Sequence, residues 1–111
     1  MTHNRPRSIE VHQVLASLSY GDAIGNEVMG IQRVLRTADY VSNIYVQAAD
    51  RDIEHLTIDY RHLPENSCAD NILIHHFSIG SRASRVAFAL PERMILVYHN
   101  ITPPDYFLNI N

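Results

Sequence analysis

The sequence predicts an α/β fold in which a parallel sheet of about four strands carries flanking helices. Short apolar runs bounded by turn residues alternate along the chain with segments of helical periodicity. A strand, a helix and a second strand follow one another in the first half of the chain, and this is the unit that builds parallel sheets. With 111 residues, 46% of them hydrophobic, the chain is expected to form one domain at most, with a modest core.

The first predicted strand spans residues 9–15, and turn-prone residues follow it up to Gly21. A helix is predicted from Asp22 onward, because apolar residues recur there at helical spacing. These residues are Ile24, Val28, Ile31, Leu35 and Ala38. Gly25 and Gly30 each weaken a helix by up to about 1 kcal/mol relative to Ala, a cost more readily explained if the backbone there approaches a strand or a ligand closely.

The remaining elements follow from shorter patterns. Residues 41–48 predict a second strand, residues 71–77 a third, and residues 81–90 a short helix capped by Ser81. The charged stretch between the second and third strands is expected to hold a short helical turn near residues 52–56 and then an irregular surface crossing. A fourth strand is predicted over residues 94–98, and its aliphatic run is typical of a strand covered on both faces. Beyond it, Thr102 is expected to cap another helix.

Composition and charge exclude several classes of function. The net charge of -3 comes from 12 acids and 9 scattered bases, which argues against a nucleic-acid partner. All the bases are Arg, so these residues contain neither a P-loop lysine nor a Schiff-base lysine. Cys68 is the only cysteine, and the default expectation is therefore a reducing, cytoplasmic location. No apolar run approaches the roughly 20 residues that cross a bilayer, which leaves open a membrane association of a longer parent protein.

Histidines lie near the predicted carboxyl ends of three strands: His12, the pair His75 and His76, and His99. In a parallel sheet these ends share one edge, where imidazoles could bind a metal, act as acid or base, or donate hydrogen bonds to a sugar or phosphate. No metal site is expected, because neither a helical histidine pair nor a carboxylate partner accompanies them. His12 and one of the adjacent pair are expected to be structural, since side chains alternate along a strand. His99 lies past the strand and is the better functional candidate.

The loop from Ser19 to Asn26 joins the first strand to the long helix. It has no second glycine two residues after Gly21, so no dinucleotide cofactor is expected. If Asp22 caps the helix, its carboxylate occupies the free backbone N–H groups; a hydroxyl-rich ligand is then expected near Asp22, with any phosphate displaced toward Gly21. The alternative is a plain capped turn. Tyr20 and Tyr98 could stack on a sugar ring or simply pack against the protein.

Four stretches, taken in order, resemble the amino-terminal domain of retaining GT-B glycosyltransferases of family four. They are His12 and Gln13, residues 18–26 (LSYGDAIGN), residues 73–80 (LIHHFSIG) and residues 98–104 (YHNITPP). In that family two Rossmann-like domains face each other across a cleft; the amino-terminal one contributes mainly the acceptor side, and the carboxyl-terminal one grips the nucleotide sugar. The resemblance implies that residues 1–111 form part of a Rossmann-like acceptor-side domain, that the carboxyl-terminal nucleotide-sugar domain is absent, and that the chain alone is inactive.

The resemblance also implies a reaction and its residues. The parent would transfer a sugar from a nucleotide-sugar donor to a hydroxyl acceptor with retention and without a cofactor. The loop around Gly21 would lie beneath the donor's diphosphate and transferred sugar, and His99 would direct its side chain or backbone carbonyl toward the donor sugar. His99 is thus the expected catalytic residue. The expected substrate-binding residues are Tyr20, Gly21, Asp22, Asn26, His75, Asn100 and Thr102.

Two other readings follow from the same pattern. One is a noncatalytic module that binds carbohydrate or self-associates, because an incomplete sheet leaves an edge and an apolar face that a homo-oligomer would cover. The other is a flavodoxin-like or response-regulator-like receiver. It fits less well, because His12 and Gln13 stand where an acidic cluster would be expected.

Overall fold

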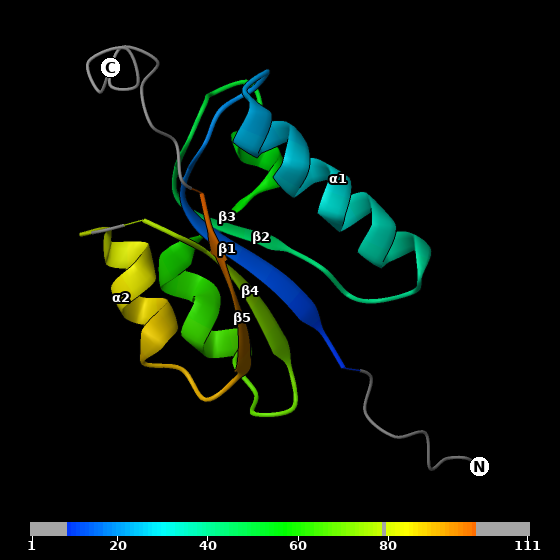
Figure 1. The fold of residues 1–111 in the computed structure, drawn as a ribbon, viewed down its shortest axis with the longest axis vertical. Helices are drawn as coiled ribbons and strands as arrows, with labels where there is room; N and C mark the ends of the chain where they lie inside the picture. The colour runs from blue at the N-terminus through cyan, green and yellow to red at the C-terminus, as the bar shows by residue number, and fades with distance from the viewer. Residues whose placement is uncertain (1–8, 79, 100–111) are drawn as a thin grey trace, which may run out of the picture.

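The computed structural model describes residues 9–78 and 80–99. It confirms the predicted α/β class with a Rossmann-like arrangement: five parallel strands in the order β3-β2-β1-β4-β5, with helices on both faces (Figure 1). In chain order the elements are β1 (Val11–Leu18), α1 (Ala23–Thr37), β2 (Ile44–Ala49), the 3-10 helix η1 (Glu54–Leu56), β3 (Ile58–Asp59), the 3-10 helix η2 (Tyr60–Asn66), β4 (Ile72–Phe77), α2 (Arg82–Phe88) and β5 (Arg93–Tyr98).

Strand β1 forms the centre of the sheet. It pairs with β2 on one side, where Gln13 lies opposite Ile44, and with β4 on the other, where Val11 lies opposite Ile72. The chain leaves β1 toward β2 and later returns to β4 on the opposite side. The carboxyl ends of β1 and β4 therefore form a topological switch point, the place where open α/β sheets bind ligands.

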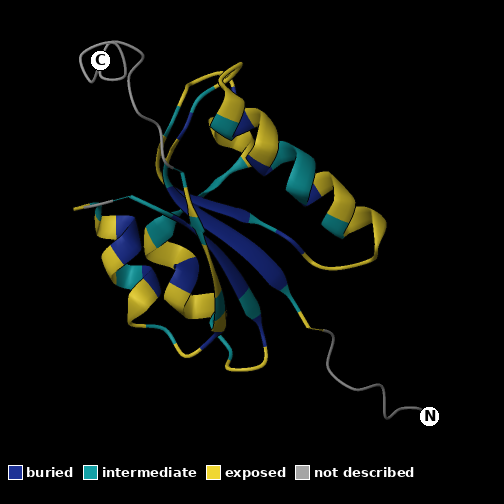
Figure 2. Ribbon diagram, viewed as in Figure 1, coloured by how far each residue is buried: buried dark blue, intermediate teal, exposed yellow. Residues whose placement is uncertain are grey.

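The two faces of the sheet are covered by different helices, as Figures 1 and 2 show: α1 lies on one face, and α2 and η2 lie on the other. Buried residues concentrate on the central strands. The core on the α1 side contains Leu15, Leu18, Val28, Ile44, Val46 and Ile53. The core on the α2 side contains Val14, Tyr45, Leu63, Leu73, Ala83 and Ala87.

The start of α1 is fixed by a cap and by a close contact. Asp22 caps the helix as expected, since its Oδ1 accepts a 2.6 Å hydrogen bond from the backbone N–H of Gly25. Gly25 itself packs against the loop, because a Cβ placed there would overlap the carbonyl oxygen of Ser19. The expected close backbone approach is thus confirmed at Gly25. It is wrong at Gly30, where an added Cβ would meet nothing within 4 Å.

Two strand predictions need correction. The sheet has five strands rather than about four; the missed one is β3, whose two residues pair with β2 through Tyr45 and Ile58 and are too few to show a periodic pattern. Strand β1 was expected to end at Leu15 but continues to Leu18, because pairing with Ala48 and Ala49 of β2 carries it on. His12 therefore lies near the beginning of β1, away from the carboxyl edge.

Strand β5 is exposed, and the expectation of a strand covered on both faces is wrong. It is the outermost strand and pairs only with β4 among the described residues. Ile95 and Leu96 are each 52% exposed, and Tyr98 is also exposed. The reason is the position of α2, which packs over β1, β2 and β4.

The contact at Gly25 predicts opposite effects of the same substitution at the two helix glycines. Gly25→Ala is expected to lower the free energy of unfolding by about 1–3 kcal/mol, because its Cβ would displace the Ser19 carbonyl. Gly30→Ala, the matched control, is expected to raise it by up to about 1 kcal/mol, because Ala is the better helix former and the space is open. Urea denaturation followed by circular dichroism measures both, and equal effects at the two positions would contradict the assigned contact.

Candidate functional site

The switch point between β1 and β4 carries a hollow of about 240 Å³. We call it the histidine hollow. It is lined by the end of β1, the first turn of α1, the end of β4 and the residue after β5: Leu15, Ala16, Ser17, Ile24, His76, Phe77, Ser78 and His99. The apolar walls come from the strands and from Ile24 of α1, and the polar groups are the two imidazoles and the side chains of Ser17 and Ser78.

A second hollow, of about 210 Å³, lies between the loop preceding α1 and the segment after β2. We call it the loop hollow. Its lining is largely apolar, with Ser19, Tyr20, Asn26 and Arg33 as residues with polar side chains. The full lining is Leu18, Ser19, Tyr20, Gly21, Gly25, Asn26, Met29, Arg33, Ile53 and Leu56. The loop is held by the backbone N–H of Tyr20, which donates to Asp50 Oδ2 at 3.0 Å, and it turns at Gly21 with φ of +84°. The Tyr20 side chain is 80% exposed.

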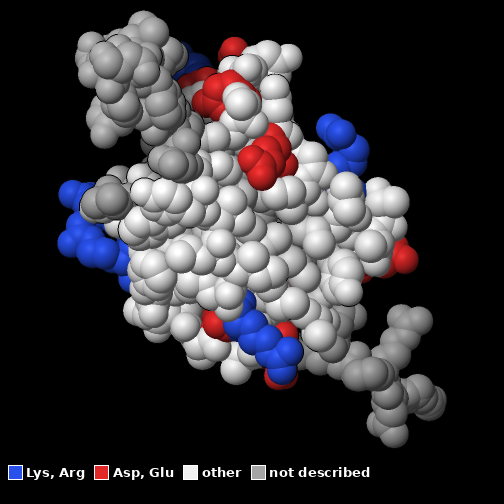
Figure 3. All heavy atoms as spheres, in the orientation of Figure 1, with Lys and Arg blue, Asp and Glu red and all other residues white. Residues whose placement is uncertain are grey.

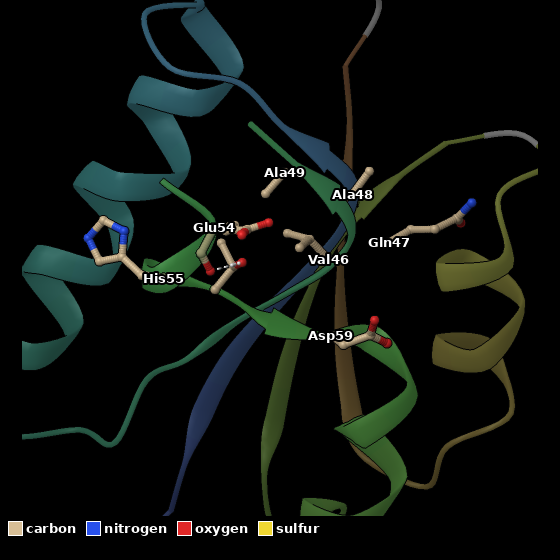
Figure 4. Close-up of a pocket in the computed structure, with 8 residues that line it drawn as sticks. Val46, Gln47, Ala48, Ala49, Glu54, His55 and Asp59 are labelled. Atoms are coloured by element: carbon tan, nitrogen blue, oxygen red, sulfur yellow. Dashed lines mark hydrogen bonds between the residues drawn. The ribbon is translucent and has the colours of Figure 1, made fainter. Parts of the chain in front are cut away.

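The largest hollow, of about 570 Å³, opens beside the end of β2 and is shown in Figure 4. Two of its polar side chains, Gln47 and Asp59, already serve the fold. Gln47 extends toward α2, where its Oε1 accepts hydrogen bonds from the backbone N–H groups of Arg82 and Ala83 at 2.9 and 3.2 Å. Asp59 pairs with Arg61 at 2.9 Å, and the hydrogen bonds from this guanidinium and backbone lower the pKa of Asp59 to about 2. Because these groups are already paired, the other two hollows are the better candidates.

A chain of polar side chains runs from the buried sheet into the histidine hollow. The Gln13 Nε2 amide donates to the carbonyl of Val28 in α1 at 2.9 Å, and Gln13 Oε1 lies 2.8 Å from His76 Nε2. His76 Nδ1 lies 2.9 Å from His99 Nε2, with the two rings nearly parallel at 15°. His99 Nδ1 lies 3.8 Å from Glu27 Oε2 on α1. Burial decreases along the chain, since Gln13 is fully buried whereas the Glu27 side chain is 50% exposed.

Burial controls the protonation of His76. Desolvation, together with charge repulsion from the neighbouring His99 and His75, lowers the pKa of His76 to about 4. His76 is therefore neutral near pH 7. A neutral imidazole has one N–H donor and one bare nitrogen acceptor. When one ring nitrogen donates a hydrogen bond, the other must therefore accept one.

Two other histidines are structural, as expected for His12 and one of the adjacent pair. His12 Nε2 lies 2.7 Å from Glu10 Oε1, and its Nδ1 accepts from the backbone N–H of Asn43 at 3.0 Å. His75 is fully buried on the α2 face, with Nε2 2.7 Å from the hydroxyl of Ser84. The binding role expected for His75 thus falls on a side chain turned away from the histidine hollow, and strand alternation brings its neighbour His76 there instead.

The other predicted site residues divide between the two hollows. Tyr20, Gly21 and Asn26 line the loop hollow, and His99 lines the histidine hollow. Asp22 stands between them as the cap of α1. Asn100 and Thr102 lie outside the described residues.

Sequence reasoning missed two further residues of this edge. Gln13 had a usable signal, because an amide in the middle of an apolar strand must find buried partners. Glu27 had none, since it resembles any exposed acid on a helix.

Within residues 9–78 and 80–99, no three His, Cys, Asp or Glu side chains gather as metal ligands would. The helices in the same part of the chain are all too short or too polar to cross a bilayer.

Comparisons with protein-family models, with curated proteins and with solved structures found no match to this chain. Function is therefore inferred from the chain's own residues and geometry.

The buried His76 predicts a loss of stability in mild acid. The unfolded chain binds a proton near the ordinary His pKa of 6.5, whereas folded His76 binds one only near pH 4. Stability from neutral His76 is thus fully present above about pH 6.5 and is lost as the pH falls toward 4, by on the order of 2–3 kcal/mol. The lowered pKa of His75 acts in the same direction.

The measurement is urea denaturation at pH 7 and pH 5. His76→Gln, which cannot titrate, is expected to flatten the decline, whereas exposed His62→Gln should leave it unchanged. An equally steep decline in wild type and His76→Gln would assign the acid sensitivity to other groups.

Proposed function

We propose that this chain is the acceptor-side part of the amino-terminal domain of a retaining glycosyltransferase, which moves a sugar from a nucleotide-sugar donor to a hydroxyl acceptor. The observation that supports the proposal is that two sequence motifs, the Gly21 loop and the segment with His99, lie at the same carboxyl edge of the sheet. The Gly21 loop and His99 lie on either side of the first turns of α1, each lining a hollow at the carboxyl edge of the parallel sheet.

The chemistry of this edge suits a sugar. Asp22 already accepts the backbone N–H of Gly25, so its carboxylate disfavours an anion directly on the start of α1. Gly21 has a positive φ and no side chain, which leaves its backbone accessible for a diphosphate beside the loop. Tyr20 offers an exposed aromatic face on which a sugar ring could stack.

Catalysis would also need positive groups that stabilise the departing nucleoside diphosphate. His76 is neutral near pH 7, and among the described residues Arg33 is the only Arg or Lys that lines either hollow. We therefore assign the stabilisation of the departing diphosphate to a carboxyl-terminal nucleotide-sugar domain. This chain alone would be inactive.

A transfer assay tests the proposal. A polypeptide that joins this chain to the nucleotide-sugar domain of the same reading frame should transfer a sugar with retained anomeric configuration. His99→Ala should lower kcat by about 10²–10³-fold, as loss of a transition-state contact does, while exposed His62→Ala should not. Unchanged turnover in His99→Ala removes His99 from the mechanism. Sugar transfer by residues 1–111 alone would contradict the proposal that catalysis needs the nucleotide-sugar domain.

A second candidate function is self-association, which the exposure of β5 favours. The outer edge of this strand is not paired by another described strand, and Ile95, Leu96 and Tyr98 are exposed. Figure 3 shows that the middle of this face is largely free of charged side chains. Two copies could pair their β5 edges and cover these side chains together.

Sedimentation velocity over a concentration series tests self-association. The wild-type chain is expected to form dimers, and Leu96→Lys is expected to leave it monomeric because a charge would be buried at the contact. Val34→Lys is the control, since Val34 is also apolar and exposed but lies on α1. A wild-type chain that stays monomeric throughout the series would exclude this function.

A further inference from the structure

Gln13, His76 and His99 form a row of hydrogen-bonded side chains at the switch point. The buried Gln13 determines which atom donates and which accepts in each of these hydrogen bonds. The amide N–H of Gln13 is used by the carbonyl of Val28, so the atom that faces His76 Nε2 is the carbonyl oxygen of Gln13. A carbonyl oxygen can only accept a hydrogen bond. His76 must therefore carry its proton on Nε2.

The tautomer of His76 determines the tautomer of His99. A neutral His76 protonated on Nε2 has a bare Nδ1, which can only accept. The atom 2.9 Å away is His99 Nε2, so this nitrogen must be the donor. Neutral His99 then has its proton on Nε2 and its lone pair on Nδ1, the atom that faces Glu27 at 3.8 Å.

We infer that Gln13 and His76 are positioning residues that hold His99 as the Nε2–H tautomer. His99 Nδ1 and the Glu27 carboxylate then accept hydrogen bonds from a neutral ligand that bears hydroxyl groups on neighbouring carbons. Both groups are acceptors, and at 3.8 Å they cannot satisfy one another while His99 is neutral. A ligand with two adjacent hydroxyls supplies one donor to each.

Anions are disfavoured at the same place. A phosphate oxygen would face a bare nitrogen lone pair and a carboxylate, with a second carboxylate nearby at Asp22. Figure 3 shows acidic side chains gathered over the amino-terminal end of α1. The choice of a sugar as the ligand rests on the proposed function, whereas the tautomer of His99 follows from the hydrogen bonds alone.

Nitrogen NMR of the whole chain labelled with ¹⁵N-histidine tests the tautomer. At about pH 8, above the ordinary His pKa of 6.5, His99 should show a protonated, pyrrole-like Nε2 and a bare, pyridine-like Nδ1. A scalar coupling across the hydrogen bond should join His99 Nε2 to His76 Nδ1. A His99 protonated on Nδ1, or on both nitrogens, overturns the inference.

A matched pair of variants separates positioning from packing. His76→Phe removes the acceptor and should lower the ratio of Nε2–H to Nδ1–H tautomer of His99 by about fivefold, the worth of one net hydrogen bond. His75→Phe, at the adjacent buried position on the other face, should leave that ratio unchanged. An unchanged ratio in His76→Phe overturns the positioning role. If this variant does not fold, the coupling in the wild-type chain decides.

The ligand is tested with two probes on the same labelled chain. Methyl α-D-glucopyranoside should shift the His99 Nδ1 resonance, and Glu27→Gln should reduce that shift severalfold, whereas inorganic phosphate should shift neither nitrogen. A response to phosphate, or none to the glucoside, overturns the ligand assignment. The proposed function fails separately, through absence of sugar transfer by the two-domain polypeptide, whatever tautomer His99 adopts.

Discussion

The buried side-chain amide of Gln13 connects three elements, β1, α1 and β4, through its hydrogen bonds. It extends from β1, donates to α1 at the carbonyl of Val28 and accepts from His76 on β4. Because Gln13 is fully buried, its amide depends on hydrogen bonds within the protein. The geometry of these hydrogen bonds, as well as apolar packing, therefore constrains the position of α1 over the switch point. The orientation of His99 follows from this constraint, and with it the polarity of the histidine hollow.

The two faces of the sheet use their polar residues differently. On the α2 face, both ring nitrogens of His12 and the Nε2 of His75 have hydrogen-bond partners, and the two rings pack against Tyr45 and Phe88 respectively. On the α1 face, the chain from Gln13 through His76 leads outward and ends at groups that solvent or a ligand can reach. One histidine set therefore stabilises the interior, while the other connects the interior to a surface hollow.

Much of this organisation could be predicted from the sequence, because it depends on local patterns. The helical period and the cap at Asp22 located α1, and bounded apolar runs located most of the sheet. Properties that depend on distant neighbours could not be predicted. An aliphatic strand such as β5 reads as buried whether or not a helix covers it, and the choice between His75 and His76 depends on which face lies toward α1. Glu27 joins the site only because β5 ends beside the first turns of α1.

The central position of β1 affects the order in which this chain can fold during synthesis. Val11 pairs with Ile72, so β1 completes its second edge only after the chain has been made as far as β4. Until then, in the unit of β1, α1 and β2, the edge of β1 that will pair with β4 stays open. Such long-range parallel pairing is slow, and the carbonyl oxygen of Gln13 lacks its His76 partner until β4 has been made.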